Sequence, residues 1–592
     1  MSTSIYGVLE ELRAQATSEA DKGSKLERLI AQYLRTDPVF AGQFSEVHLW
    51  QDWPGRAGKH DTGIDIVAVD RLTGGRVAIQ CKFFDPHHSI GKPDIDSFLS
   101  ASGKEGFTQR IIVSTTDKWN PHAEDAIQGQ QIPVQRIGLA ELEASPVDWE
   151  AFTWAHPEFL PTTDKKKLRP HQSQAIKDVC EGLATADRGK LVMACGTGKT
   201  FTSLRLAEQL VGQGGSVLFL VPSISLLSQT LREWATEAVV PLAPIAVCSD
   251  RKATARSQAK DEDISAVDLA LPSTTSIPIL EARWRLALGR AEAMTVVFAT
   301  YQSIEVVAQA QAQGQLPDFG LIVCDEAHRT TGTTLAGEDE SAFVRIHNAA
   351  YIRGAKRLYM TATPRIYDDS SKAKAGQASA VLASMDDETI FGAELHRLGF
   401  GEAVAKDLLS DYKVLVLAVD ETAVSRTFQL QLADEGNELR LDDAAKIVGC
   451  WNGLAKRGDI EHPFAGDPAP MRRAVAFAGT IKDSQRVQAL FAQTVAQYAA
   501  AHDLDDASGD PMLRCEIEHV DGSYNALERN TRLDWLRGDV PDGVCRILTN
   551  ARCLSEGVDV PALDAVMFLS PRKSVVDIVQ SVGRVMRKSP GK

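Results

Sequence analysis

The segment KLVMACGTGKTFTSLRLAEQL, residues 190–210, constrains the fold of this chain more than any other. A short apolar run leads into a glycine-rich turn and then into an amphipathic stretch, which predicts a strand, a tight loop and a helix. Gly196 and Gly198 let the loop backbone turn its N–H groups towards one point, and the helix adds the positive end of its dipole. Such a loop binds phosphate, so the segment predicts a nucleotide-binding α/β domain.

Side chains at the end of this loop have the chemistry that a nucleoside triphosphate requires. Lys199 supplies a positive charge for the β- and γ-phosphates, Thr200 offers a hydroxyl to Mg²⁺, and Thr197 lies in the loop itself. Met193 stands where the pattern G-x-x-x-x-G-K-[ST] has its first glycine, so only the second half of that pattern is present. A glycine-rich turn without a ligand is the alternative interpretation of the segment taken alone.

A second acidic motif supports the nucleotide interpretation. LIVCDEAHRT, residues 321–330, places Asp325 and Glu326 at the end of an apolar run that predicts a buried strand. Asp325 is expected to hold Mg²⁺ through water, and Glu326 to orient the attacking water. Acidic residues that merely cap the next helix are the alternative, which the order of loop and acidic strand disfavours.

Other β-branched runs alternate with amphipathic stretches along the chain, among them SVLFLVP, MTVVFATY and KRLYMTATP. Strands that alternate with helices predict parallel sheets covered on both faces. A chain of 592 residues exceeds what one core can organise, so we expect three or four domains. The proline- and charge-rich stretch 156–172 marks one boundary.

The stretch DIVAVDRLTGGRVAIQCKFF, residues 65–84, predicts a β-hairpin with polar groups at one end. With the turn centred between Leu72 and Thr73, Asp65 lies opposite Gln80, and Lys82 shares the face of Gln80 because strand side chains alternate. A carboxylate and an amide oxygen bind Mg²⁺, and a neighbouring lysine stabilises charge on an attacked phosphate. The alternative is a hairpin with a solvated polar face.

The composition of the chain indicates its cellular location and bears on whether it binds DNA. No apolar run approaches the roughly 20 residues of a membrane-spanning helix, and the N-terminus lacks the pattern of a secretory signal. Nine cysteines without C-x-x-C pairs favour reduced thiols, so we expect a cytoplasmic protein without a membrane partner. The net charge of −15 argues mildly against DNA binding, although a large motor can bind DNA in a local groove.

From residue 165 to 592 the chain resembles superfamily 2 helicases. Their motifs occur in order as LRPHQ, MACGTGKT, LVPSISLLSQT, DEAH, TATP, AFAGT, TNARCLSEGVDVPALDAVMF and QSVGRVMR. The resemblance implies two RecA-like domains, 165–395 and 400–592, with ATP and Mg²⁺ in the cleft between them. It also implies roles for particular residues: Gln172 reads adenine, Gly557 and Asp559 lie by the nucleotide, and Arg584 and Arg587 act as arginine fingers.

The helicase resemblance extends, with less specificity, to hydroxyl residues. Thr361 and Thr363 would couple the ATP state to the grip on DNA. Groups near Ser223, Thr300, Thr480 and Thr549 would contact the DNA backbone, although a Ser or Thr at a strand end is more often a cap or turn residue.

Residues 1–160 resemble the Mrr-type branch of the PD-(D/E)xK nucleases, whose signature reads Asp and then Gln-x-Lys. Asp65, Gln80 and Lys82 match this signature, and the resemblance implies Mg²⁺-dependent DNA cleavage. GSKLERLIAQYL, residues 23–34, resembles the first helix of that branch, with Glu27 as a further acidic ligand. The fold expected is therefore α/β, with a nuclease domain before two RecA-like parallel-sheet domains.

A nuclease in front of such a motor resembles type ISP restriction enzymes, which implies an ATP-dependent translocase and endonuclease acting on double-stranded DNA. The sequence stops soon after its last helicase motif, so we expect an incomplete second RecA-like domain and the front part of a longer protein. Methyltransferase and target-recognition modules would then lie in a further segment or a partner subunit. A stand-alone nuclease–helicase for repair or phage defence, and a non-cleaving DNA sensor ATPase, remain alternatives.

Overall fold

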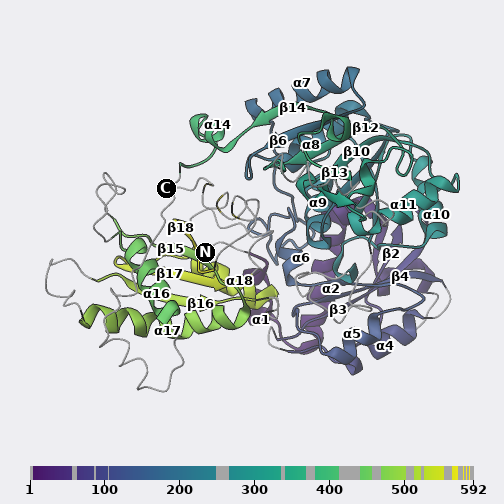
Figure 1. Ribbon diagram of the computed structural model, residues 1–592. Coiled ribbons are helices and arrows are strands. Elements are labelled where there is room, and N and C mark those ends of the chain that lie inside the picture. Colours follow the sequence, from purple (N-terminus) through teal and green to yellow (C-terminus); the bar gives the residue numbers. More distant parts are fainter. Residues whose placement is uncertain are drawn as a thin grey trace. The chain divides into compact units, whose positions relative to one another are not determined.

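The computed structural model describes residues 4–56, 63–85, 88–103, 106–248, 266–334, 341–367, 381–411, 441–456, 469–501, 512–521, 524, 526–551, 563–570, 578, 582 and 586. The chain forms two compact units. One comprises Met1–Met193 and Gly198–Leu398, and the other Ala194–Thr197 and Gly399–Lys592. Both units are α/β, as the alternation of apolar runs predicted (Figure 1).

The first unit begins with a mixed sheet in the order β1-β2-β3-β4-β5. The hairpin pairings of β1, β2 and β3 are antiparallel, and β3, β4 and β5 run parallel. We call this part the nuclease domain, after the family that its sequence resembles. Its elements are α1 (Ile5–Gln15), α2 (Glu19–Thr36), α3 (Pro38–Gln43), β1 (Phe44–Leu49), β2 (Ile66–Asp70), β3 (Arg76–Lys82), α4 (Lys92–Ser102), β4 (Phe107–Ser114), α5 (Pro121–Ile127), β5 (Val134–Ile137) and α6 (Leu139–Glu143).

Helices cover both faces of this sheet because each strand alternates buried apolar side chains between the two faces. On one face α4 and α5 bury Phe98 and Ile127 against Val67 and Ile112 of the strands. Helix α2 packs on β1 and β3. Its apolar residues recur every three or four positions, and Ser18 caps its first turn by accepting the Asp21 N–H at 3.1 Å.

The rest of the first unit is a seven-stranded parallel sheet in the order β14-β6-β12-β10-β7-β9-β8. We call this part the first lobe. Its strands and main helices are α7 (Pro170–Thr185), β6 (Arg188–Met193), α8 (Lys199–Leu210), β7 (Ser216–Val221), α9 (Ile224–Glu237), β8 (Leu242–Val247), α10 (Ile277–Leu288), β9 (Met294–Thr300), α11 (Ile304–Ala312), β10 (Phe319–Cys324), β12 (Gly354–Thr361), α13 (Glu388–Phe391) and β14 (Ala393–Leu398). A separate small ladder pairs β11 (Gly332–Thr334) with β13 (Val381–Ala383).

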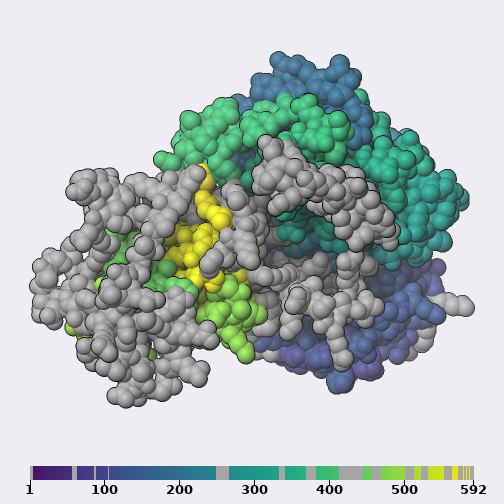
Figure 2. All heavy atoms as spheres, viewed as in Figure 1, coloured from purple at the N-terminus to yellow at the C-terminus, as the bar shows by residue number. Residues whose placement is uncertain are grey.

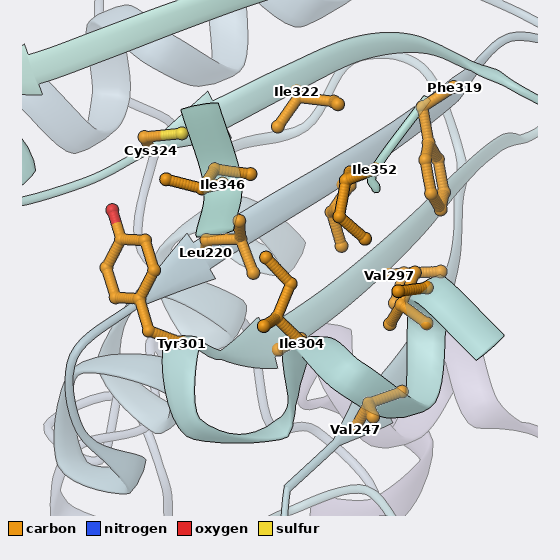
Figure 3. Packing of buried hydrophobic residues seen from close by; sticks show 14 of the residues in the cluster. Leu220, Val247, Val297, Tyr301, Ile304, Phe319, Ile322, Cys324, Ile346 and Ile352 are labelled. Atoms are coloured by element: carbon orange, nitrogen blue, oxygen red, sulfur yellow. The ribbon is translucent and has the colours of Figure 1, made fainter. Parts of the chain in front are cut away.

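One large apolar cluster fills the space between this sheet and α10 and α11. Figure 3 shows Phe319, Ile322 and Cys324 of β10 in this cluster with Leu220 of β7 and Val297 of β9. These strands are apolar along their whole length because helices bury both of their faces. The carboxyl ends of β6 and β10, where the glycine-rich and acidic motifs lie, are therefore held on a rigid scaffold.

The second unit contains a parallel sheet in the order β16-β17-β15-β18. Its elements are α14 (Phe400–Ala405), α16 (Leu441–Leu454), β15 (Arg473–Phe477), α17 (Ile481–Ala501), β16 (Arg514–His519), α18 (Ala526–Arg537), β17 (Val544–Asn550) and β18 (Ala565–Phe568). Trp451, Phe491 and Ile547 lie in its main core. In the parts of the chain given above, no helix combines the length and apolarity needed to cross a bilayer.

Candidate active sites

The hairpin of the nuclease domain has the register that its turn predicted. Ile66 pairs with Ile79 and Val67 with Ala78, and the Asp65 N–H donates to the Ile79 carbonyl at 3.0 Å. Asp65 therefore lies opposite Gln80, at the open end of the hairpin. The Asp65 carboxylate accepts the Cys81 N–H at 2.7 Å, which fixes the side chain against the backbone of β3.

The Gln80 side chain is held through its nitrogen, and its oxygen has no hydrogen-bond partner. Gln80 is 3% exposed, and its Nε2 donates to the Gly63 carbonyl at 3.0 Å. A carbonyl can only accept, so this bond fixes which end of the amide is nitrogen. Gly63 has φ +83°, a conformation that favours glycine, and Gln80 Oε1 is buried with no hydrogen-bond partner.

Glu27 and Lys82 complete the predicted set. Helix α2, which carries Glu27, packs on β3. Burial, followed by the negative charges of Asp65 and Glu27, raises the pKa of the Cys81 thiol well above its usual value, so both carboxylates lie near that thiol. Lys82 is half-buried on β3, two residues from Gln80 and on the same face of the sheet.

These residues fit a divalent cation. A buried amide oxygen without a partner is costly, and a hard cation is a natural partner for it beside two carboxylates. Within the described residues, no group of three or more His, Cys, Asp or Glu has metal-binding geometry. A metal here would therefore depend on the Gln80 amide in addition to Asp65 and Glu27.

The glycine-rich loop of the first lobe has the backbone that its sequence predicted. Gly196 and Gly198 have φ +82° and +88°, and Lys199 opens helix α8. Thr197 bonds to the Ala194 carbonyl through its N–H at 3.3 Å and its hydroxyl at 2.7 Å, which closes the turn. The positive φ values and the helix N-terminus together form a phosphate-binding loop.

Gln172 packs directly against this loop. Its Oε1 accepts the Arg169 N–H at 2.9 Å, which caps α7, and a Cβ placed on Gly198 would overlap its Nε2. The side chain is 5% exposed. Gln172 therefore joins the start of α7 to the phosphate-binding loop.

The acidic motif lies next to the glycine-rich loop at the carboxyl ends of the parallel strands. Lys199 Nζ lies 3.6 Å from Glu326 Oε1, and these side chains are 11% and 15% exposed. Asp325 is buried, and its Oδ1 accepts the Glu326 N–H at 2.9 Å. Glu326 has φ 47°, a left-handed conformation that is strained for this residue type and is concentrated at functional sites.

The two neighbouring carboxyl groups have opposite pKa shifts. Burial, and then the charge of Glu326, raises the pKa of Asp325. Burial also acts against the charged form of Glu326, but Lys199, His328 and Arg329 outweigh it and lower the pKa of Glu326. The lysine therefore keeps Glu326 ionised, while a cation beside Asp325 would favour its ionised form.

His328 and Tyr301 take part in this site, although the sequence analysis gave them no role. His328 Nδ1 lies 3.1 Å from Thr361 Oγ1 and 3.3 Å from Glu326 Oε2, which connects the acidic motif to the TATP segment. The Tyr301 hydroxyl donates to the Asp325 carbonyl at 2.7 Å. The histidine of DEAH was a visible signal, whereas only the fold brings Tyr301 to Asp325.

The hydroxyl residues expected at the DNA backbone are bonded locally. Ser223 accepts the Leu226 N–H, Thr300 donates to Ser303, and Thr480 bonds to Asp483. Thr549 is fully buried, and its hydroxyl lies 3.3 Å from the Ser484 carbonyl and 3.2 Å from the Glu518 carbonyl, to either of which it can donate. The Thr549 hydroxyl is thus a structural group. Gly557, Asp559, Arg584 and Arg587 lie outside the described residues.

Three family models match the chain in succession. Residues 35–159 match a restriction endonuclease family, residues 165–366 the "Type III restriction enzyme, res subunit" family, and residues 475–589 the "Helicase conserved C-terminal domain". The nuclease hairpin, the nucleotide loop with its acidic motif, and the sheet of the second unit fall in these three segments in that order.

Known proteins resemble the chain over most of its length. The solved structure of the "ATP-dependent Type ISP restriction-modification enzyme LlaBIII bound to DNA" is 40% identical, has a TM-score of 0.82, and is matched over 99% of this chain and 37% of its own. A nuclease-deletion mutant of the type ISP enzyme LlaGI is 37% identical over 71% of this chain and 26% of its own, with a TM-score of 0.48. "Probable helicase A859L" of African swine fever virus is 25% identical over 77% of this chain and 44% of its own length. The chain thus spans less than half of each of these relatives.

Proposed function

We propose that the chain is an ATP-dependent DNA translocase coupled to a Mg²⁺-dependent DNA endonuclease. A match to a restriction endonuclease family, followed by matches to the res-subunit and helicase families, supports this proposal, as does the similarity to an ATP-dependent type ISP restriction-modification enzyme. The role of this chain is restriction-type defence against foreign double-stranded DNA. One observation carries this proposal: a single compact unit contains both the Asp65–Gln80 hairpin and the Lys199–Glu326 site.

In the motor, the N–H groups of the Gly196–Gly198 loop bind the phosphates of ATP, and Gln172 contacts the base. Thr200 and Asp325 would hold Mg²⁺, which would neutralise charge on the phosphates. A γ-phosphate attracts Lys199 away from Glu326, and the released carboxylate then orients the attacking water. His328 relays the position of Glu326 to Thr361.

The second lobe contributes residues whose assignment rests on the sequence alone. Arg584 and Arg587 stabilise the transferred phosphoryl group, and Gly557 and Asp559 lie beside the nucleotide. The domain bounds that accompany this assignment are 1–160, 165–395 and 400–592.

In the nuclease, the Cys81 N–H holds Asp65 in place, and the Gly63 carbonyl holds Gln80 Nε2, which leaves the buried Oε1 without a protein partner. Asp65, Gln80 and Glu27 would hold Mg²⁺, which would supply positive charge to the attacked phosphodiester. Lys82 stabilises the charge that develops on the attacked phosphate.

Further modules would choose the DNA on which the protein acts. Methyltransferase and target-recognition modules, in a further segment or a partner subunit, would select the DNA.

The eight cysteines that the structure describes form no disulfide, which supports a reducing compartment, and we place the protein in the cytoplasm.

Two substitutions separate the proposed activities. Lys199→Ala should abolish ATP hydrolysis and ATP-dependent cleavage, because the phosphates lose their cation. Asp65→Ala should abolish cleavage and leave DNA-stimulated ATP hydrolysis unchanged. Steady-state phosphate release and gel analysis of linear duplex DNA measure the two activities side by side.

Exposed residues of the same types provide controls for these variants. Lys177→Ala on α7 and Asp125→Ala on α5 should leave both activities at the wild-type level. Retention of ATP hydrolysis by Lys199→Ala, or of cleavage by Asp65→Ala, would show that the corresponding site is wrongly assigned.

A further inference from the structure

Helix α9 contacts both parts of the first unit, the first lobe and the nuclease domain. It begins after β7, with Ser223 as its N-cap, and it packs against β7, β9 and α8 of the first lobe. It also packs against α3 of the nuclease domain. Figure 1 shows α9 at the boundary between the teal first lobe and the purple nuclease domain, and Figure 2 shows these two parts as adjoining surfaces.

Arg232 of α9 bridges two carboxylates of the nuclease domain. Its Nη1 lies 3.1 Å from Asp37 Oδ2, and its Nη2 pairs with Glu141 Oε1. Arg232 is 8% exposed and Asp37 is fully buried. A planar guanidinium held by two carboxylates away from water adopts one geometry, so this contact is stiff.

Asp37 is built into the nuclease fold at the end of the helix that carries Glu27. It follows α2 directly, and its Oδ1 accepts the N–H groups of Val39 at 3.0 Å and Phe40 at 3.4 Å. Its Oδ2 accepts the Ser145 hydroxyl at 2.6 Å in addition to Arg232. A displacement of Arg232 therefore acts on the junction of α2 and α3, and through α2 on β3.

The catalytic hairpin reaches the first lobe at its turn as well. Leu72, in the turn between β2 and β3, packs against the main core cluster of that lobe. The end of α2, the helix that carries Glu27, and the turn of the hairpin that carries Asp65 and Gln80 therefore both contact the first lobe.

The other end of this connection is the nucleotide site. Trp234, two residues after Arg232, donates from Nε1 to the Thr200 carbonyl at 3.2 Å. Its ring is fully buried and packs edge-to-face on Phe219 and Phe298, at centroid distances of 5.1 and 5.7 Å. Thr200 lies in the first turn of α8, so a movement of this turn on phosphate binding is passed to α9.

We propose that α9 couples the nucleotide state of the motor to the nuclease site, with Arg232 as the positioning residue that transmits the change. This inference rests on the proposed function, because it needs both sites to be active. It assigns to one helix the communication that an ATP-dependent nuclease requires.

Hydrogen exchange of the natural full-length protein with and without a non-hydrolysable ATP analogue and Mg²⁺ tests this coupling. In the wild type, the nucleotide should slow exchange in peptides of α8 and also change exchange in peptides of α2 and α3. In Arg232→Met, the α8 response should remain and the α2–α3 response should disappear. Glu141→Gln keeps the Asp37 contact and should lose part of that response.

Another ion pair between the same two parts provides the matched control. Arg136 of β5 contacts Asp268 of the first lobe at 2.7 Å, without involving α9. Asp268→Asn should loosen docking to a similar extent and retain the α2–α3 response. Cleavage events per ATP hydrolysed should fall on the order of 10-fold in Arg232→Met and remain at the wild-type value in Asp268→Asn.

The outcomes separate the coupling from the proposed function. An α2–α3 response that persists in Arg232→Met, that is lost equally in Asp268→Asn, or that is missing from a wild type whose α8 responds would overturn the coupling. A wild type whose α8 shows no response to the nucleotide would instead contradict the assignment of the ATP site.

Discussion

The single side chain that best supports the proposed metal site of the nuclease domain is Gln80. In most surroundings a buried glutamine bonds through both ends of its amide, but here Gly63 takes only the nitrogen end. The oxygen is then buried without a protein partner. A sequence can place Gln80 opposite Asp65, but it cannot show which end of the amide is held.

Replacement of this amide gives the first prediction at the residue scale. Gln80→Ala should lower Mg²⁺-dependent DNA cleavage by more than the roughly 10- to 100-fold that loss of an outer-shell partner costs. ATP hydrolysis should be unchanged, because Gln80 is not part of the Lys199–Glu326 site. Cleavage assayed as a function of Mg²⁺ concentration measures both the maximal rate and the metal affinity.

Another buried glutamine of the same domain serves as its control. Gln43 of α3 is 8% exposed and donates to Gln109 at 3.3 Å, and neither residue is a predicted metal ligand. Gln43→Met should lower stability but leave the Mg²⁺ dependence of cleavage as in the wild type. An unchanged Mg²⁺ dependence in Gln80→Ala would remove the amide from the metal site.

At the scale of elements, His347 joins the strand before the TATP segment to the turn after the acidic motif. Its Nε2 donates to the Thr330 carbonyl at 2.9 Å, and its Nδ1 accepts from the Tyr359 hydroxyl at 2.9 Å. Both ring nitrogens are satisfied in the neutral form. Burial, assisted by Arg357 and Arg188, lowers the pKa of His347 to about 4 against the favourable effect of the Thr330 carbonyl.

This shift predicts a loss of stability in acid. Between the pKa of an unfolded histidine, about 6.5, and about 4, the unfolded state binds a proton that the folded state does not, so the free energy of unfolding falls as pH is lowered. The contribution at pH 5 is about 2 kcal/mol. Urea unfolding of the first unit at pH 7.5 and pH 5 measures it.

Two substitutions that remove the titrating ring check the origin of that loss. His347→Gln and His347→Phe should both reduce the difference between the two pH values by a similar amount, although they lower stability at pH 7.5 to different extents. An undiminished difference in both variants would mean that other groups cause the acid sensitivity.

Sequence reasoning was successful where structure is set locally. The hairpin register followed from the position of its turn, and the loop conformation of Gly196 and Gly198 followed from their lack of a side chain. The order of the seven strands, and the contact of Tyr301 with Asp325 at a separation of 24 residues, depend on tertiary packing. No periodicity in the sequence contains that information.

At the scale of the whole molecule, sequence patterns do not predict the tertiary contacts that we propose to link the two activities. Arg232 is separated by 195 residues from Asp37 and by 91 from Glu141, and none of these residues belongs to a motif that the sequence analysis recognised. The net charge of −15, read as mild evidence against DNA, reflects the average surface and carries no information on a local groove.

The central claim is that ATP hydrolysis by the motor drives DNA cleavage by the nuclease in one protein. The most direct test compares cleavage of linear duplex DNA by the wild-type natural protein in Mg²⁺ with ATP, with a non-hydrolysable ATP analogue, and without nucleotide. We predict cleavage only with ATP, and none with ATP in the Asp65→Ala variant. Equal cleavage under all three conditions would contradict the account, because the nuclease would then act without the motor.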